Sequence, residues 1–409
     1  MLQPGCVEML IACDCWKEKR MVDFELISAD GHINEPPAAW TRVQKEYGDR
    51  APKVVKDPEG FKGIWVITDG LPPSPCSNYS IGHVVSKPEG LGSVDLDKHY
   101  QRIHFHENFT YENFPASWEP AARIKDQDTD GVAAEVLFAS VGRFFYGLTE
   151  GAFQRAIFRS YNAWLHEFCS YDPKRLIGVA LISILDPEKA AQDIREYAAL
   201  GFKAVQIPYA IKDGGYYDPV YEPVWNAAED NGMVVHIHLG GPAQGVKPNW
   251  FGFKRLSAEG SSDFFGAQRI ATATGFISHL MFSGAFDRHP NLKVVCTEYD
   301  VGWVAIMYEQ ANYRYGRATA YGSDVKLKMA PGDYMKRHAW FTFQDDRAGM
   351  LTTPVFGADN FMWASDYPHG NTTWPYSQQT MERIGAGVNS DVKRKVGREN
   401  ANRLYRMGL

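Results

Sequence analysis

Short apolar runs recur along this chain and alternate with segments of helical periodicity. The runs predict eight buried strands, at residues 24–30, 131–139, 177–184, 203–208, 233–238, 293–298, 339–343 and 361–365. Apolar runs of this length are typical of parallel strands, which other elements cover on both faces. The pattern therefore predicts a largely parallel sheet.

Helical segments separate most of these strands. Residues 150–171 place apolar side chains at helical spacing, from Phe153 to Phe168. Asp186 followed by Pro187 predicts a helix start, Gly201 predicts its end, and a further helix is expected at 219–231. Strands and helices in this order predict a distorted (β/α)8 TIM barrel, and no GxGxxG loop follows the first strand to indicate a dinucleotide fold.

The length of the chain fits one elaborated barrel. Such a barrel needs about 250 residues, and the chain has 409. We interpret residues 1–21 as an unstructured leader and 22–409 as a single metal-dependent barrel domain. Within it, the Pro- and Gly-rich stretch 36–116 interrupts the alternation and predicts a cap or arm inserted after strand one.

Composition excludes several classes of partner. Lys and Arg number 43 against 49 Asp and Glu, a net charge of −6, so nucleic acid is not an expected partner. No apolar run reaches the roughly 18 to 20 residues of a membrane-spanning helix. Of the six cysteines, three lie in the leader, which argues against a disulfide framework and favours a cytoplasmic location.

Polar side chains follow four of the predicted strands. Asp30 and His32 end strand one, His238 ends strand five, Glu298 ends strand six, and Asp366 ends strand eight. In barrels the chemistry lies at these strand ends, and residues two apart on a strand share a face. One such residue alone is more often a loop cap than a ligand, but four together favour a divalent metal held by nitrogen and oxygen.

Several motifs carry a family resemblance that spans roughly residues 22–405. They include DGHINEP after strand one, DGVAAEVLF at strand two, SGAFDRHPNLKVV before strand six and MWASDYPHGNTTWPYS at strand eight. With them the chain resembles the amidohydrolase-related group of the amidohydrolase superfamily, which contains aminocarboxymuconate-semialdehyde decarboxylase and the aromatic-acid decarboxylases. The resemblance implies a metal, zinc above all, held by Asp30, His32, His238 and Asp366. It also implies that Asp366 can move a proton, and it favours a homodimer or a related hetero-oligomer.

One position departs from the better-studied members. Many carry a His-Gly-Gly segment at strand six, whereas this chain has Glu298 at the histidine position. A glutamate there is a proton acceptor, an acid if its pKa is raised, or another ligand. Together with Glu35 it makes the site rich in oxygen donors, which suits iron or manganese as well as zinc and leaves room for a second ion.

Other candidates for the site are weaker. His369 follows Asp366 and is a candidate to bind substrate or donate a proton, and Gln344 and Arg347 follow strand seven, where they could meet a carboxylate. His104 and His106 on the insertion either close over the barrel mouth or pack the cap. His236 and His279 are expected to be structural.

The sequence thus predicts a metal-dependent hydrolase or carbon-carbon lyase, decarboxylase-like, that acts on a small carbonyl or carboxylate compound. Two alternatives stay open. One is an iron- or manganese-dependent oxygenase on the same barrel, possibly dinuclear. The other is a catalytically degenerate barrel that serves as a structural partner subunit.

Overall fold

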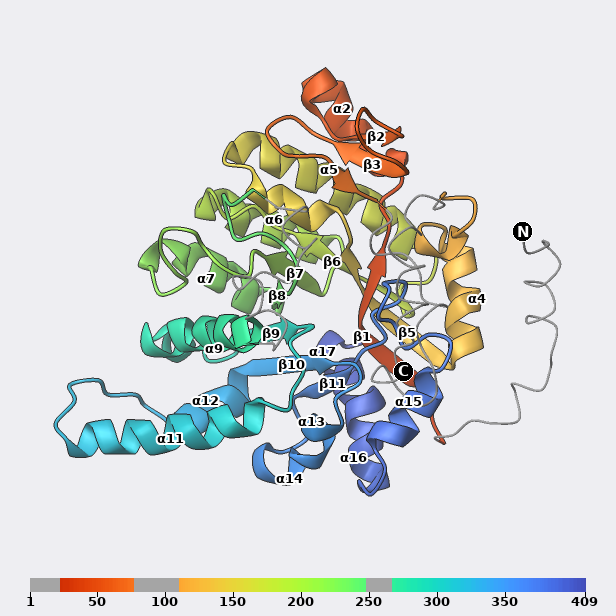
Figure 1. Cartoon of the computed structure of the whole chain (residues 1–409). Helices are drawn as coiled ribbons and strands as arrows, with labels where there is room; N and C mark the ends of the chain where they lie inside the picture. The colour runs from red at the N-terminus through yellow and green to blue at the C-terminus, as the bar shows by residue number, and fades with distance from the viewer. Residues whose placement is uncertain (1–22, 77–109, 248–266) are drawn as a thin grey trace.

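Eight parallel strands form the centre of the molecule. The computed structural model describes residues 23–76, 110–247 and 267–409 (Figure 1). The sheet has the order β1-β5-β6-β7-β8-β9-β10-β11, and neighbouring strands in this order pair parallel. Its strands are β1 (Leu26–Ile33), β5 (Val132–Ala139), β6 (Leu176–Leu181), β7 (Ala204–Ile207), β8 (Val234–His238), β9 (Lys293–Thr297), β10 (Ala339–Phe343) and β11 (Phe361–Trp363). The sheet is nearly closed into the predicted (β/α)8 barrel.

The strand limits differ from the apolar runs mainly at β1. The sequence places the end of this strand at residue 30, but β1 continues to Ile33, because Gly31, His32 and Ile33 pair with β5. His32 therefore lies within the ladder and not in a loop after it, and Asp30 lies in the same strand at the bulge between Ser28 and Gly31. A ligand carried on a paired strand has less conformational freedom than one on a loop.

The first and last strands meet at a seam. The amide N–H of Asp366 donates to the carbonyl of Asp30 at 2.9 Å, and the amide of His32 donates to the carbonyl of Tyr367 at 2.6 Å. The hydroxyl oxygens of Ser28 and Ser365 lie 3.0 Å apart. The chain segment after β11 is thereby fixed against β1, where the ligand candidates lie.

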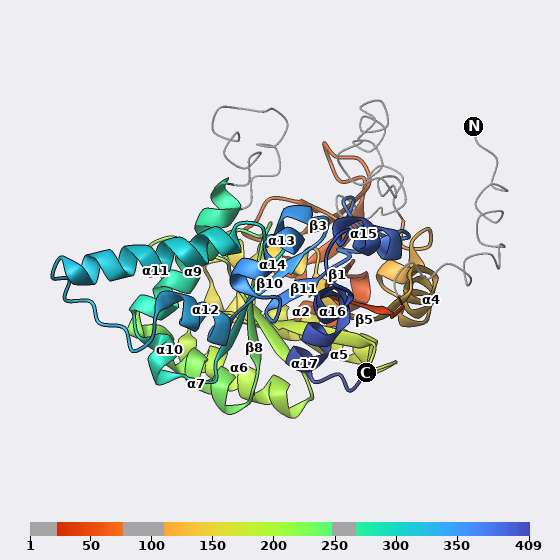
Figure 2. The same cartoon turned by 90° about the horizontal axis from the view of Figure 1, so that it is seen from below.

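Helices cover the outside of the barrel (Figures 1 and 2). Those between strands are α4 (Pro120–Asp130), α5 (Gly151–Cys169), α6 (Pro187–Ala199), α7 (Glu222–Asp230), α9 (Ala267–Phe282), α10 (Ala285–Arg288), α11 (Val304–Ala320), α12 (Pro331–His338), α13 (Arg347–Leu351) and α14 (Thr353–Phe356). Asp186 caps α6 as predicted, because its side chain accepts from the amide of Lys189, and Gly201 follows the helix with φ +97°. After β11 come α15 (Ser377–Ile384), α16 (Ser390–Arg394) and α17 (Asn400–Tyr405).

The last helix closes one end of the barrel. Leu404, Tyr405 and Met407 pack with the side chains inside the barrel, among them Ile27, Val136, Val234, Val295 and Met362. Tyr405 also places its hydroxyl 3.2 Å from Nε2 of His236. Because this end is filled, the polar side chains at the carboxyl ends of the strands face the other end.

The described part of the predicted insertion forms a small separate sheet. Here α2 (Thr41–Tyr47) is followed by β2 (Lys53–Lys56), β3 (Ile64–Ile67) and β4 (Ser74–Pro75), which pair antiparallel in the order β2-β3-β4. The N-terminal side of α2 is tied to α5 through the hydroxyl of Ser160, which donates to the carbonyl of Ala39 at 2.8 Å. His104, His106 and the predicted leader 1–21 lie outside the described residues.

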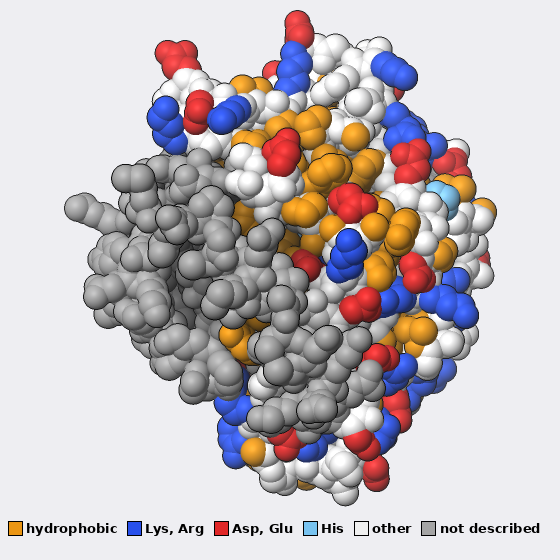
Figure 3. Space-filling view, turned by 90° about the vertical axis from the view of Figure 1, so that its right-hand side faces the viewer, with side chains coloured by type: hydrophobic (Ala, Val, Ile, Leu, Met, Phe, Trp, Pro, Cys, Tyr) orange, Lys and Arg blue, Asp and Glu red, His pale blue; other side chains and the backbone are white. Residues whose placement is uncertain are grey.

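The surface carries charges of both signs. On the face turned to the viewer in Figure 3, Lys and Arg side chains lie among Asp and Glu side chains, with hydrophobic side chains between them. This agrees with the small net charge of −6. Within the described ranges, no helix is both long and apolar enough to cross a membrane.

Candidate metal centre

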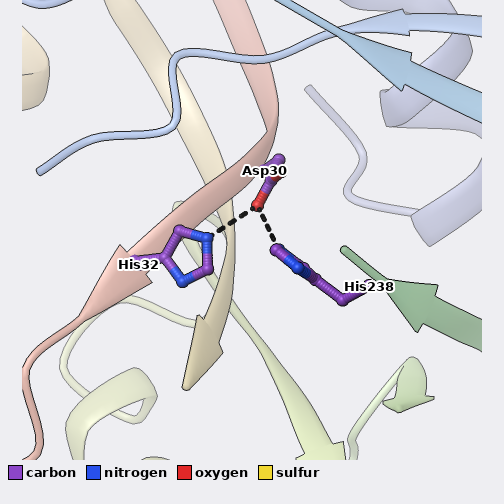
Figure 4. A group of neighbouring side chains, drawn as sticks. All are labelled: Asp30, His32 and His238. Atoms are coloured by element: carbon purple, nitrogen blue, oxygen red, sulfur yellow. Dashed lines mark hydrogen bonds and ion pairs between the residues drawn. The ribbon is translucent and has the colours of Figure 1, made fainter. Parts of the chain in front are cut away.

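Four side chains from three parts of the sheet converge at the carboxyl end of the barrel strands. Oδ1 of Asp30 lies 3.3 Å from Nε2 of His32 and 3.3 Å from Nε2 of His238 (Figure 4). Nε2 of His32 also lies 3.2 Å from Oδ1 of Asp366. All four residues are buried. The structure thus brings together four of the five residues that the sequence proposed as metal ligands, and Glu298 is the fifth.

Several polar atoms of this group form no hydrogen bond, although His32 Nε2 and Asp366 Oδ1 lie within ion-pair distance of each other. Asp30 Oδ2, both ring nitrogens of His32 and both carboxylate oxygens of Asp366 are buried without a hydrogen bond. Buried polar atoms are nearly always satisfied, so a cluster of orphaned acceptors needs an explanation. A divalent cation at their centre fits, because it bonds to carboxylate oxygen and to unprotonated imidazole nitrogen. Asp30, His32 and His238 form one group with suitable spacing, and His32, Asp366 and His369 form another.

His238 has the tautomer that a metal ligand needs. Its Nδ1 lies 2.6 Å from the carbonyl of Leu239, an acceptor, and 3.1 Å from Nη1 of Arg143, a donor; the shorter contact assigns the proton to this nitrogen. Nε2 then has a free electron pair and faces Asp30. A second hydrogen bond that fixes the ring in this way is typical of histidine ligands.

Burial favours the uncharged forms of these groups, so it raises the pKa values of the carboxyls and lowers that of the histidine. Burial and the neighbouring Asp366 raise the pKa of Asp30 well above its usual value, and burial raises the pKa of Asp366 to about 7. Burial and Arg143 lower the pKa of His238 to about 4. A bound cation would reverse the shifts of the carboxylates, since it stabilises their charged form.

Glu298 lies beside the group without joining it. Its Oε2 is 3.6 Å from Nδ1 of His238, and its side chain is 15% exposed, so it lies at the rim. Burial and Asp366 raise its pKa to about 8. Its backbone has φ +69°, and Asp300 and Asp366 also have positive φ, at 55° and 54°. Non-glycine residues in this region are strained and cluster at functional sites.

His369 contacts two members of the group. Its Nδ1 lies 2.9 Å from Oδ1 of Asp366, and its ring stacks on His32 with centroids 3.7 Å apart. On the other side, its Nε2 lies 3.2 Å from Oγ of Ser140. Among the weaker histidine candidates that the structure describes, His369 is the one that contacts the ligand candidates, through Asp366 and His32.

Two residues of the site were missed by sequence reasoning. Arg143 is buried after β5 and places Nη1 3.1 Å from Nδ1 of His238, and Ser140 contacts His369. Both belong to the segment Ser140 to Gly147 that follows strand two, and a cation directly after a buried strand was the available signal. The positive charge of Arg143 acts against burial at Asp30, Asp366 and Glu298: it lowers their pKa values and so offsets part of the increase that burial causes.

Three other candidates are engaged elsewhere. Both carboxylate oxygens of Glu35 accept hydrogen bonds from the amides of Val141 and Gly142, so Glu35 holds this loop, and it belongs to neither of the two spaced groups. Gln344 donates to the carbonyl of Ser365 and accepts from the side chain of Asn371. Arg347 is exposed on α13.

The guanidinium of Arg347 donates to the carbonyls of Arg383 and Ala386. Arg347 therefore does not lie with the ligand candidates. Two histidines outside the centre have partners of their own. His236 lies one layer below the ligands, with Nδ1 2.8 Å from the hydroxyl of Thr297, and His279 packs edge-on against the ring of Tyr217.

Known proteins resemble this chain in sequence and in fold. Over 267 residues it is 28% identical to a gamma-resorcylate decarboxylase of Rhodococcus jostii, covering 61% of this chain and 77% of that protein. An amidohydrolase of Mycobacterium avium subsp. paratuberculosis has a similar structure, with a TM-score of 0.72 at 20% identity, covering 94% of this chain and all of that one.

A 5-carboxyvanillate decarboxylase of Novosphingobium aromaticivorans, crystallised with manganese, also has a similar structure. Its TM-score is 0.60 at 17% identity, and the match covers 94% of this chain and 96% of that one. The sequence model of the amidohydrolase family matches residues 102–407. This match spans most of the chain, and the chain therefore belongs to the amidohydrolase family.

Proposed function

We propose that this protein is a metal-dependent decarboxylase that acts on a small carboxylic acid, with one divalent ion held by Asp30, His32, His238 and Asp366. The observation that carries the proposal is the convergence of these side chains, with their orphaned buried atoms, in a member of the amidohydrolase family. The similarity to a gamma-resorcylate decarboxylase favours decarboxylation over hydrolysis and suggests a hydroxylated aromatic acid.

The geometry supports one ion in preference to two. Both candidate groups contain His32, and the same atom, Nε2, faces Asp30 and Asp366. An imidazole nitrogen has one electron pair and binds one ion, so the two groups describe a single site with alternative donors. The second ion for which the sequence left room is not required.

The donor set and the comparisons favour manganese. Two carboxylates and two imidazoles suit manganese or iron as well as zinc. A similar structure contains manganese, so manganese takes the place of zinc as the preferred ion. When bound, such an ion orients a carboxylate substrate and stabilises negative charge that develops on it.

Glu298 is the candidate proton donor. Decarboxylation breaks the bond between the carboxyl carbon and its neighbour, leaves the electron pair on the neighbouring carbon, and requires a proton there as CO₂ departs. Burial raises the pKa of the Glu298 carboxyl to about 8 in the metal-free chain, and its place at the rim lets it face a substrate, so its environment favours the protonated form that a general acid needs. Arg143 supplies a buried positive charge beside His238 that can meet the substrate carboxylate, the role that the sequence suggested for Arg347.

The test is an assay of the manganese-loaded protein with gamma-resorcylate and with 5-carboxyvanillate. CO₂ release is measured in the presence and in the absence of oxygen. We expect CO₂ from at least one hydroxylated aromatic acid and no oxygen uptake. Oxygen consumption that accompanies turnover would favour an oxygenase. Ester or amide cleavage without CO₂ would favour a hydrolase.

A further inference from the structure

One buried guanidinium spans the barrel seam beside the ligands. Arg123 of α4 is fully buried, and its Nε donates to Oε2 of Glu135 at 2.6 Å. Its Nη1 donates to the carbonyl of His32 at 2.8 Å and to that of Ala116 at 3.3 Å, and its Nη2 donates to the carbonyl of Tyr367 at 3.0 Å. The side chain therefore joins α4, β1, β5 and the segment after β11.

These contacts fall next to the ligands on both sides of the seam. His32 is itself a ligand candidate, and Tyr367 directly follows Asp366. The carbonyl of Tyr367 also accepts from the amide of His32, at 2.6 Å. A shift of either carbonyl would change the separation of His32 and Asp366, which is 3.2 Å between Nε2 and Oδ1.

Glu135 fixes the guanidinium in turn. Besides Arg123, its Oε2 accepts from the side chain of Gln127 at 2.8 Å, and its Oε1 lies 3.4 Å from Oγ of Ser365. Arg123 also lies over the ring of Tyr367, 4.6 Å from its centroid. A planar group held on this many sides is rigid, which suits a group that sets a distance between two strands.

The same pair explains the glycine between the two ligands of β1. A Cβ atom on Gly31 would lie 3.1 Å from Nη2 of Arg123 and 3.1 Å from Oε1 of Glu135. Those neighbours are buried and hydrogen-bonded, so they have little room to give. The Asp-Gly-His segment thus has glycine at its centre because the Arg123–Glu135 pair lies against that residue.

We propose that Arg123, held by Glu135, is a positioning residue for the metal centre: it sets the backbone on both sides of the seam so that Asp30, His32 and Asp366 face one ion. This inference rests on the proposed metal site. It gives the buried ion pair a role beyond stability.

The experiment measures Mn²⁺ binding by the metal-free full-length protein, with Mn²⁺ alone as the probe. Free Mn²⁺ is followed by electron paramagnetic resonance at a temperature where circular dichroism shows the variant to be folded. The variants are Arg123→Lys, whose ammonium cannot donate to both carbonyls in a planar fork, and Gly31→Ala, which pushes the pair aside. The control is Arg155→Lys, which breaks a bidentate pair with Asp193 on the outer helices.

We expect Arg123→Lys and Gly31→Ala to weaken Mn²⁺ binding about 10- to 100-fold, as other changes behind metal ligands do. Arg155→Lys should lower the melting temperature of the metal-free protein and leave Mn²⁺ affinity within about twofold. Where Arg123→Lys does not yield folded protein, Gly31→Ala decides the matter.

Unchanged Mn²⁺ affinity in a folded Gly31→Ala or Arg123→Lys protein would overturn the positioning role and leave the pair with a structural one. Failure of the unmodified chain to bind Mn²⁺ would instead overturn the proposed metal site. The two failures are therefore distinguishable in one titration.

Discussion

Asp366 and His369 face each other, with Oδ1 of Asp366 2.9 Å from Nδ1 of His369. The same oxygen lies 3.2 Å from Nε2 of His32. Asp366 therefore stands between a ligand on β1 and a histidine of its own loop. Its positive φ shows that the chain accepts strain to place it there.

Replacing the Asp366 carboxylate should remove high-affinity metal binding. Asp366→Asn keeps the shape of the side chain but lacks the charge that a divalent ion requires. We therefore expect the affinity for Mn²⁺ to fall by at least about 100-fold and CO₂ release to be lost. Metal content by mass spectrometry after gel filtration checks this. The matched control is Asp359→Asn, an exposed carboxylate on the outside of the barrel, and equal metal content in both variants would refute the assignment.

His369 is expected to support the centre from behind Asp366. His369→Gln removes the ring that contacts Asp366 and Ser140, and such changes typically cost about 10- to 100-fold in metal affinity or activity. Titration with Mn²⁺ and turnover assays measure the two effects separately. As a control, His338→Gln alters a buried histidine that bonds to the carbonyl of Leu292, away from the ligands.

Glu298→Gln should separate catalysis from metal binding. Because Glu298 belongs to neither ligand group, we expect Mn²⁺ affinity to stay within a few-fold while turnover falls about 10²- to 10⁴-fold, the usual share of a general acid.

The pH profile of turnover carries the sign of this role. The acid must be protonated, so activity should fall as pH rises through the pKa of Glu298. That pKa is about 8 without metal and lower with a cation bound. The variant should lose this descending limb, and an unchanged profile would assign the proton to another group.

Glu35 should make folding stability fall with rising pH. Burial raises its pKa from 4.5 to about 7 in the folded chain, which therefore binds the proton more tightly than the unfolded chain does. The stabilisation is complete below pH about 4.5 and is lost as pH rises through about 7. Its size, from about 1.4 kcal/mol per pKa unit, is roughly 3 kcal/mol.

Urea unfolding at pH 5 and pH 7.5 tests this dependence, with Glu35→Gln expected to flatten it. Glu167→Gln, at a carboxylate whose side chain is 60% exposed, is the comparison. A Glu35→Gln protein with the same pH dependence as the unmodified chain would show that another buried carboxyl is responsible.

The pattern of apolar runs determined the barrel. All eight strands were found within a few residues, because a parallel strand covered on both faces must be apolar almost throughout, and helix starts such as Asp186-Pro187 have local causes. The strand ends also identified Asp30, His32, His238 and Asp366, since parallel strands bring their carboxyl ends to one edge.

Tertiary structure alone decided how those side chains are held and which neighbours they have. Arg143 and Ser140 enter the site through a loop whose course no periodicity encodes, and Glu35 and Arg347 are drawn to backbone groups far along the chain. Arg123 binds the carbonyls of His32 and Tyr367, which lie 91 and 244 residues away along the chain. These contacts form only when the barrel closes. Sequence determines which side chains are available at each strand end, whereas the closed fold sets their distances, burial and charge.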